Sequence, residues 1–91
     1  MYISNEKKEK ISEQILAYLY SMNPKPVFTF DIAKEIARDE EFVKKLLIDL
    51  KKKNFIIEIK KNPKGIPYTK RSRWKISDEI YLLYKQKQVS N

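Results

Sequence analysis

The side chains of this sequence best suited to a binding or catalytic role are mainly those of Lys and Arg, and they are concentrated in one segment. From Phe42 to Ile76 the chain holds 12 Lys or Arg residues and two acids, Asp49 and Glu58, so this segment carries +10. Because the whole chain carries +8, the residues outside the segment sum to −2. A one-sided basic field is the electrostatic footprint of a protein that binds a polyanion. Nucleic acid is therefore the first partner that the sequence predicts.

The residue types that are missing exclude several kinds of site. The sequence has no Cys and no His, which excludes a disulfide framework, a thiol nucleophile and a zinc finger, and removes the commonest general base. The carboxylates show no paired spacing, and the single Gly rules out a Gly-rich phosphate loop. We therefore expect a binding protein rather than an enzyme, with no metal site and no cofactor.

The length and hydropathy of the chain predict one small soluble domain. A chain of 91 residues suits a single core, which we assign to residues 1–88, with a frayed tail over 89–91. No stretch is apolar enough for an export signal or a membrane span, so we expect a cytoplasmic protein. The frequent Lys, Ile and Glu are thermophile-like, although an AT-rich genome would also favour Lys and Ile.

The pattern of apolar residues predicts three helices in the first half of the chain. Apolar residues at helical spacing over 11–22 indicate an amphipathic helix. After a β-prone stretch at 27–30, Thr29 is expected to cap a second, short helix. Asp39 is expected to cap a third helix, whose apolar side holds Phe42, Val43, Leu46, Leu47 and Leu50.

The second half of the chain predicts a hairpin and a last helix, so the expected class is α+β and mainly helical. A strand is expected over 55–60, with a buried face formed by Phe55, Ile57 and Ile59. A turn around Gly65 leads into a partner strand over 71–76, whose core-facing residues are Trp74 and Ile76. Ser77 is expected to cap the last helix, whose inner side holds Ile80, Leu83 and Tyr84.

Over about residues 11–77 the sequence resembles the winged helix-turn-helix family. The stretch IAKEIARDEEFVKKLLIDLKKKNFI, residues 32–56, is similar to the family's two-helix unit with a capped turn and a Lys-rich exit into a Phe-Ile strand. The run Trp74-Lys75-Ile76-Ser77 resembles the end of the family's wing. The resemblance implies a three-helix core, a short strand, a two-stranded wing and a C-terminal helix. It also implies that the third helix enters the major groove of duplex DNA and that the wing lies against the backbone or minor groove.

One side of the predicted third helix is polar and basic. A helical wheel places these residues opposite the apolar side: Glu41, Lys44, Lys45, Ile48, Lys51 and Lys52. Lys side chains there could meet phosphates or guanine edges, and Ile48 could touch a thymine methyl group. The alternative is a solvated Lys face with one stray apolar residue.

The predicted wing is strongly basic, with seven bases and no acid between Ile59 and Ser77. We expect its DNA contacts to come from Lys60, Lys61, Lys64, Tyr68, Lys70, Arg71, Arg73 and Lys75. Arg71 or Arg73 could enter a narrow minor groove. The alternative is an edge hairpin whose charges prevent strand pairing between molecules. Tyr68 would then cover the hairpin instead of stacking on a sugar or base.

Three acids, Asp39, Glu40 and Glu41, oppose this interpretation because they begin the predicted third helix and repel phosphates. Acids at this end stabilise the helix dipole. Glu41 could instead accept a hydrogen bond from a cytosine amino group, or this end of the helix could meet a protein.

We therefore expect a double-stranded DNA-binding protein that regulates transcription. The alternative is a winged-helix module that docks on a transcription or replication protein through Phe42, Ile48 and the acidic start of the third helix. RNA binding ranks lower, since the hairpin lacks an aromatic ladder. We also expect a homodimer through the terminal helices, with candidate interface residues Leu16, Tyr20, Tyr81 and Leu82. These residues could instead cover the back of the core.

Overall fold

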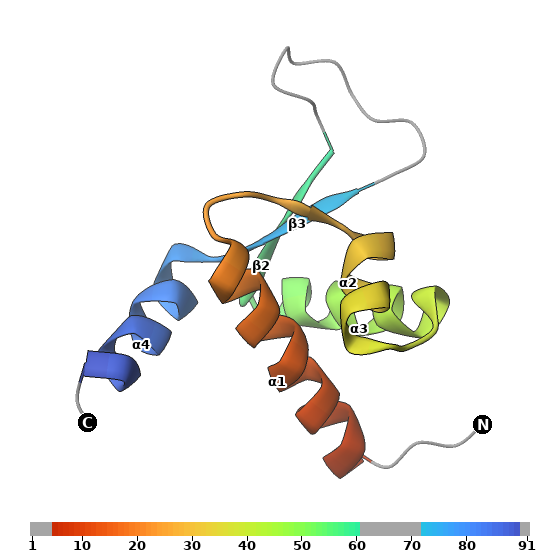
Figure 1. Cartoon of the computed structure of the whole chain (residues 1–91), viewed down its shortest axis with the longest axis horizontal. Helices are drawn as coiled ribbons and strands as arrows, with labels where there is room; N and C mark the ends of the chain where they lie inside the picture. Colours follow the sequence, from red (N-terminus) through yellow and green to blue (C-terminus); the bar gives the residue numbers. More distant parts are fainter. Residues whose placement is uncertain (1–4, 61–71, 90–91) are drawn as a thin grey trace.

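Four helices and a small antiparallel sheet make up the computed structural model, which describes residues 5–60 and 72–89 (Figure 1). In chain order the elements are α1 (Asn5–Met22), β1 (Val27–Phe28), α2 (Thr29–Ile36), α3 (Glu40–Lys52), β2 (Ile56–Ile59), β3 (Arg73–Ile76) and α4 (Asp78–Val89). This order confirms the expected α+β, mainly helical class. Within the described ranges, none of the helices has the apolar length that a bilayer span requires.

The core forms where α1, α2 and α3 bring their apolar sides together against one face of the sheet. The stripe predicted on α3 is confirmed, because Val43, Leu46, Leu47 and Leu50 are all buried. On α1 the buried stripe is wider than expected and includes Leu16, which is only 7% exposed. The expectation that Leu16 lines a dimer interface is therefore wrong, since this side chain already packs inside the core.

Two of the three predicted helix caps are present. The Asp39 carboxylate accepts a hydrogen bond of 3.2 Å from the Phe42 amide, and the Ser77 hydroxyl accepts one of 3.3 Å from the Ile80 amide. Both bonds satisfy amides that a helix start leaves unpaired. The predicted Thr29 cap is wrong, because Thr29 is the first residue of α2 and its hydroxyl oxygen instead accepts a bond from Trp74.

The sheet has the order β1-β3-β2, and both strand pairs are antiparallel. Trp74 and Ile76 of the central strand β3 are buried, as expected. The expected buried face of β2 is wrong: Ile56 is buried, whereas Ile57 is 44% exposed. The reason is the register, which pairs Ile56 with Ile76 and Glu58 with Trp74 and so turns these residues to the core side.

The last helix, α4, lies on the opposite side of α1 from α2 and α3 (Figure 1). Its contact with α1 is aromatic, because the Tyr20 ring lies 5.1 Å from that of Tyr81 and 5.5 Å from that of Tyr84, measured between centroids. The expectation that Leu83 faces inward is wrong, since it is 53% exposed. The helix includes Val89, and the remainder of the expected tail lies outside the described residues.

Candidate nucleic-acid interface

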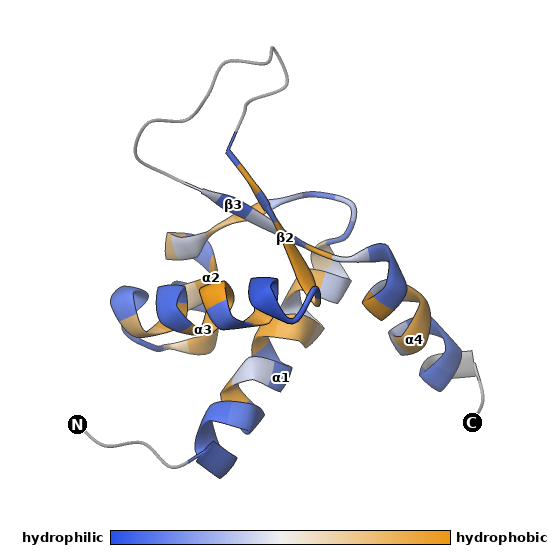
Figure 2. Cartoon of the chain, turned by 180° about the vertical axis from the view of Figure 1, so that it is seen from behind, coloured by the Kyte–Doolittle hydropathy of each residue, from blue (hydrophilic) through white to orange (hydrophobic). Residues whose placement is uncertain are grey.

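The outer side of α3 is exposed along its whole length, because the helix packs into the core only through its opposite, apolar side. All six residues predicted for the recognition face are exposed: Glu41, Lys44, Lys45, Ile48, Lys51 and Lys52. Figure 2 shows hydrophilic and hydrophobic residues alternating along α3, as an amphipathic helix requires. Ile48 is 40% exposed and stands among charged neighbours. This side of α3 can therefore offer ammonium groups and one apolar contact to a partner.

A surface hollow lies over the first two turns of this same face. Its lining combines acids and bases with one apolar residue, namely Asp39, Glu40, Glu41, Lys44, Lys45 and Ile48. The acids stand at the positive end of the helix dipole, where they stabilise α3. The two Lys residues follow one turn later, so the hollow changes from acidic to basic along the helix axis.

A polar cluster around Glu58 joins the end of α3 to the sheet. The Lys51 ammonium lies 2.7 Å from Glu58 Oε1, the Lys60 ammonium lies 3.9 Å from the same oxygen, and the Ser72 hydroxyl donates to Oε2. Two bases predicted for separate segments, the third helix and the wing, therefore meet at one carboxylate. Sequence reasoning did not select Glu58 or Ser72, although Glu58 is one of two acids in the basic segment.

The pKa of Glu58 reflects this environment. Partial burial alone would raise the pKa, but hydrogen bonds from Lys51 and Ser72 and the charges of Lys51 and Lys60 outweigh burial and lower it. The carboxylate is therefore ionised at neutral pH. It neutralises part of the positive charge where α3 and β2 approach each other.

The described part of the wing presents its bases in different ways. Lys60 is exposed at the end of β2, and Lys75 is half-buried on the central strand. Arg73 is also half-buried, and its guanidinium carbon lies 5.9 Å from the centroid of the Phe28 ring, so part of this side chain packs on β1. The other predicted wing residues lie outside the described residues: Lys61, Lys64, Tyr68, Lys70 and Arg71.

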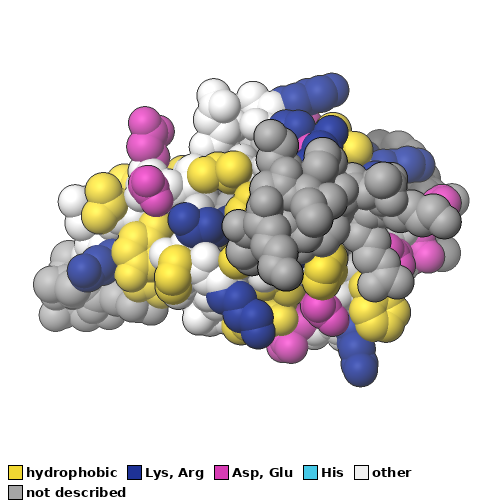
Figure 3. Space-filling view, turned by 90° about the horizontal axis from the view of Figure 1, so that it is seen from above, with side chains coloured by type: hydrophobic (Ala, Val, Ile, Leu, Met, Phe, Trp, Pro, Cys, Tyr) yellow, Lys and Arg dark blue, Asp and Glu magenta, His cyan; other side chains and the backbone are white. Residues whose placement is uncertain are grey.

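Seen from above the view of Figure 1, the described surface is mixed rather than uniformly basic (Figure 3). Lys and Arg side chains stand beside acidic and hydrophobic side chains on this face.

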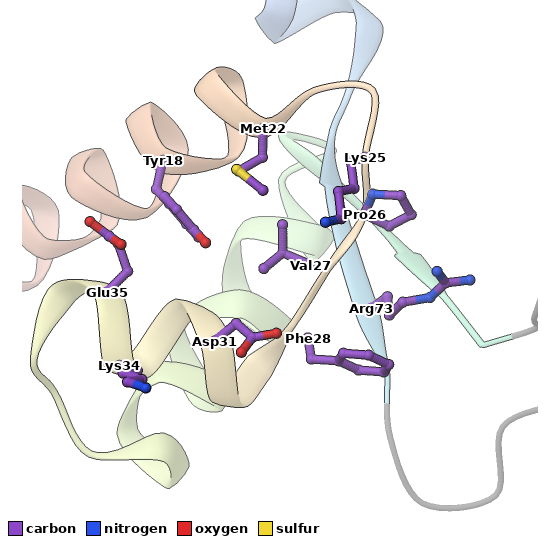
Figure 4. Close-up of a pocket in the computed structure, with 10 residues that line it drawn as sticks. All are labelled: Tyr18, Met22, Lys25, Pro26, Val27, Phe28, Asp31, Lys34, Glu35 and Arg73. Carbon is purple, nitrogen blue, oxygen red and sulfur yellow. The ribbon is translucent and has the colours of Figure 1, made fainter.

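A second hollow lies between α1, β1, α2 and β3 (Figure 4). Tyr18 of α1 points into it toward α2, and burial followed by the charges of Glu35 and Asp31 raises the pKa of this tyrosine. Lys25 and Arg73 stand on the side nearer the sheet. Sequence reasoning did not find this hollow, because its lining comes from four elements and no motif joins them.

Comparison with family models and with curated proteins found no match. Solved structures, in contrast, share the arrangement. A mutant of MepR from a multidrug-resistant clinical isolate of S. aureus is 25% identical, with a TM-score of 0.63 over 92% of this chain and 54% of that chain. MepR in complex with DNA is 24% identical, with a TM-score of 0.69 over 96% and 63%. The chain thus spans between half and two thirds of MepR.

A smaller protein domain is matched over nearly its full length. The Zalpha domain of PKZ from Carassius auratus, solved in complex with Z-DNA, is 23% identical, with a TM-score of 0.59 over 77% of this chain and 97% of that domain. These likenesses confirm the fold that the sequence resemblance implied.

Proposed function

We propose that this chain, which has the winged helix-turn-helix fold, is a cytoplasmic, non-catalytic regulator of transcription that binds double-stranded DNA. The observation that carries the proposal is the division of α3: one side is buried in the core, and the opposite side exposes Lys44, Lys45 and Ile48. The likeness to MepR, solved in complex with DNA, supports it. We further propose that residues 1–88 act as one domain.

In this proposal α3 lies in the major groove and the wing lies on the backbone or in the minor groove. Lys44 and Lys45 reach guanine edges or phosphates, and Ile48 meets a thymine methyl group. Lys51 and Lys60, held near Glu58, stand where α3 and the wing would straddle one phosphate strand. The proposed wing contacts beyond the described residues are those of Lys61, Lys64, Tyr68, Lys70 and Arg71.

A salt titration with a pool of random-sequence duplexes tests this function. If roughly six phosphates are engaged, the logarithm of affinity should fall with the logarithm of salt concentration at a slope near −5. Sequencing the retained duplexes would then give the preferred site. Failure to bind duplex at low salt, or a slope near zero, would refute the proposal.

One observation favours a second candidate, a module that docks on a transcription or replication protein. The exposed acids Glu40 and Glu41 line the hollow on α3 beside Lys44, and a phosphate approaching there would meet like charge. A protein surface with charges of both signs would fit such a hollow better. Capture of a protein partner with both basic and acidic groups, together with absence of duplex binding at moderate salt, would favour this candidate.

We also propose a homodimer formed through α4. Of the four candidate interface residues, Leu16 is buried, and Tyr20 and Tyr81 contact each other within the chain. Leu82 is 55% exposed, so it is still available to a second chain, and we add the neighbouring exposed residue Leu83 to the proposed interface. Sedimentation of the wild type should give the mass of two chains, and Leu82→Glu with Leu83→Glu should give one. A wild-type monomer at high concentration would refute the dimer.

A further inference from the structure

The Glu58 carboxylate is the place where three segments of the chain meet. It lies on β2, accepts a hydrogen bond of 2.7 Å from Lys51 in the last turn of α3, and accepts another from Ser72, directly before β3. Only 13% of the Glu58 side chain is exposed, compared with 48% of the Lys51 side chain. An ion pair with one shielded partner and two hydrogen-bond donors is stronger than an ordinary surface pair.

The strand register explains why an acid reaches this position. Glu58 stands opposite the buried Trp74 and follows Ile56 by two residues, so it lies on the core side of the sheet rather than the solvent side. Glu58 is the last residue of β2 on this side, so the apolar face of this strand ends here. A carboxylate at the edge of the core needs polar partners, and here they are Lys51 of α3 and Ser72, directly before β3.

The main chain already ties the other end of β2 to α3. The Phe55 amide donates 3.0 Å to the Leu50 carbonyl, and the Ser77 amide donates 2.9 Å to the Phe55 carbonyl. The first bond attaches the start of β2 to α3, the second attaches it to the residue before α4, and the pairing of β2 with β3 continues to Ile59. The Lys51–Glu58 pair is a second attachment between β2 and α3, three residues further along the strand, so it adds a constraint on the angle between the paired strands and α3.

We propose that Glu58 is a positioning residue for DNA binding, which fixes the direction of the wing strands relative to α3. This inference rests on the proposed function of the same surface. A recognition helix and a wing can contact one duplex together only if their relative direction matches the groove and the backbone. In this role Glu58 sets the relative direction of α3 and the wing, although its negative charge opposes phosphate binding in a segment that carries +10.

A purely electrostatic role for Glu58 makes the opposite prediction from a positioning role. If Glu58 merely neutralised nearby bases, its removal would strengthen attraction to phosphates. If it holds the wing in place, its removal would weaken binding although the protein becomes more positive. The sign of the change in affinity therefore separates the two roles.

The matched pair for this test is Glu58→Gln and Asp49→Asn. Both variants remove one negative charge from the basic segment and keep the side-chain size, but Asp49 is exposed, pairs with Lys53 directly after α3, and is not among the proposed DNA contacts. We expect Asp49→Asn to tighten duplex binding by about twofold and Glu58→Gln to weaken it by about three- to tenfold. Lys51→Met should weaken binding similarly, and the double variant should lose less than the product of the two single losses. Tighter binding by Glu58→Gln would overturn the proposal.

A measurement without DNA separates this inference from the proposed function. Amide hydrogen exchange in Glu58→Gln should be faster in β2 and β3 than in the wild type, with α1 and α2 unchanged. A wild type that binds no duplex would refute DNA binding, and the exchange data would still decide whether Glu58 holds the strands. Unchanged exchange in β2 and β3 would refute the positioning role even if duplex binding is confirmed.

Discussion

The indole N–H of Trp74 donates a hydrogen bond of 2.8 Å to the hydroxyl oxygen of Thr29, and both side chains are buried. The bond links the central strand β3 to the first residue of α2, two segments that are far apart in sequence. It satisfies the one polar group of an indole that is otherwise surrounded by the core. The bond therefore adds to the pairing of β1 with β3 in holding the start of α2 against the sheet.

Thr29→Val should destabilise the fold because it keeps the shape of the side chain but removes the acceptor. The buried Trp74 N–H would lose its partner, at a cost of about 1 to 3 kcal/mol. Thr29→Ser is the matched control, since it keeps the hydroxyl and loses one methyl group, which is worth about 1 kcal/mol at most. Urea unfolding of the three proteins measures both effects. A Val variant as stable as the wild type would show that the bond contributes nothing.

Ala37→Gly should stabilise the protein. Ala37 follows α2 with φ of 56°, in the left-handed region, where a Cβ atom is unfavourable. Glycine removes this strain but gains freedom in the unfolded chain, so the net gain should be at most about 1 kcal/mol. Ala33→Gly, the same substitution inside α2, should have the opposite sign and cost about 1 kcal/mol or more. Thermal unfolding of both variants measures these effects. A melting temperature of Ala37→Gly below that of the wild type would contradict this interpretation.

The stability of the wild type should depend on Glu58 in acid. The pKa of Glu58 is lowered from its ordinary value of 4.5 because its partners outweigh the effect of burial. The ionised carboxylate therefore contributes stability to the folded protein. This contribution is fully present above pH 4.5, the ordinary pKa that applies to the unfolded chain, and it is lost as the pH falls through the lower pKa of the folded state. The difference in unfolding free energy between wild type and Glu58→Gln should be constant near neutral pH and shrink in acid. A difference that stays constant through the acid range would exclude this linkage.

Lys44→Ala and Lys45→Ala should change which duplexes are preferred, since these side chains are proposed to reach base edges. Losing a good base contact should reduce discrimination at one position by about 1 to 3 kcal/mol. Lys10→Ala, which removes the same charge from the exposed side of α1, is the control for a general loss of attraction. Competition between the enriched duplex and single-base variants of it measures the effect. Equal loss for every duplex would assign Lys44 and Lys45 to phosphates only.

Much of the fold could be predicted from the sequence because the helical signals are strong and local. The caps at Asp39 and Ser77, the buried stripe of α3 and the inward Trp74 all depend on residues close in sequence. The face of β2 could not be predicted, because Phe55, Ile56 and Ile57 are all apolar and do not alternate. Only pairing with β3, which sets Ile56 against Ile76, selects the face.

The site was harder to predict than the fold because its key contacts join distant segments. The exposed bases of α3 follow from the helical period alone. The Glu58 cluster depends on β2 and α3 approaching each other, so neither spacing nor composition indicates that Lys51 and Lys60 meet at one oxygen. The outward position of Leu83 likewise depends on how α4 packs, which it does through Tyr81 and Tyr84 against Tyr20 of α1.

The most direct test of duplex binding by α3 and the wing is protein NMR during titration with a duplex from the enriched pool. Amide shifts should concentrate in α3 from Lys44 to Lys52 and in the base of the wing around Lys60 and Arg73, and α4 should change least. Shifts confined to α1 and α4, with α3 unaffected, would contradict the central claim.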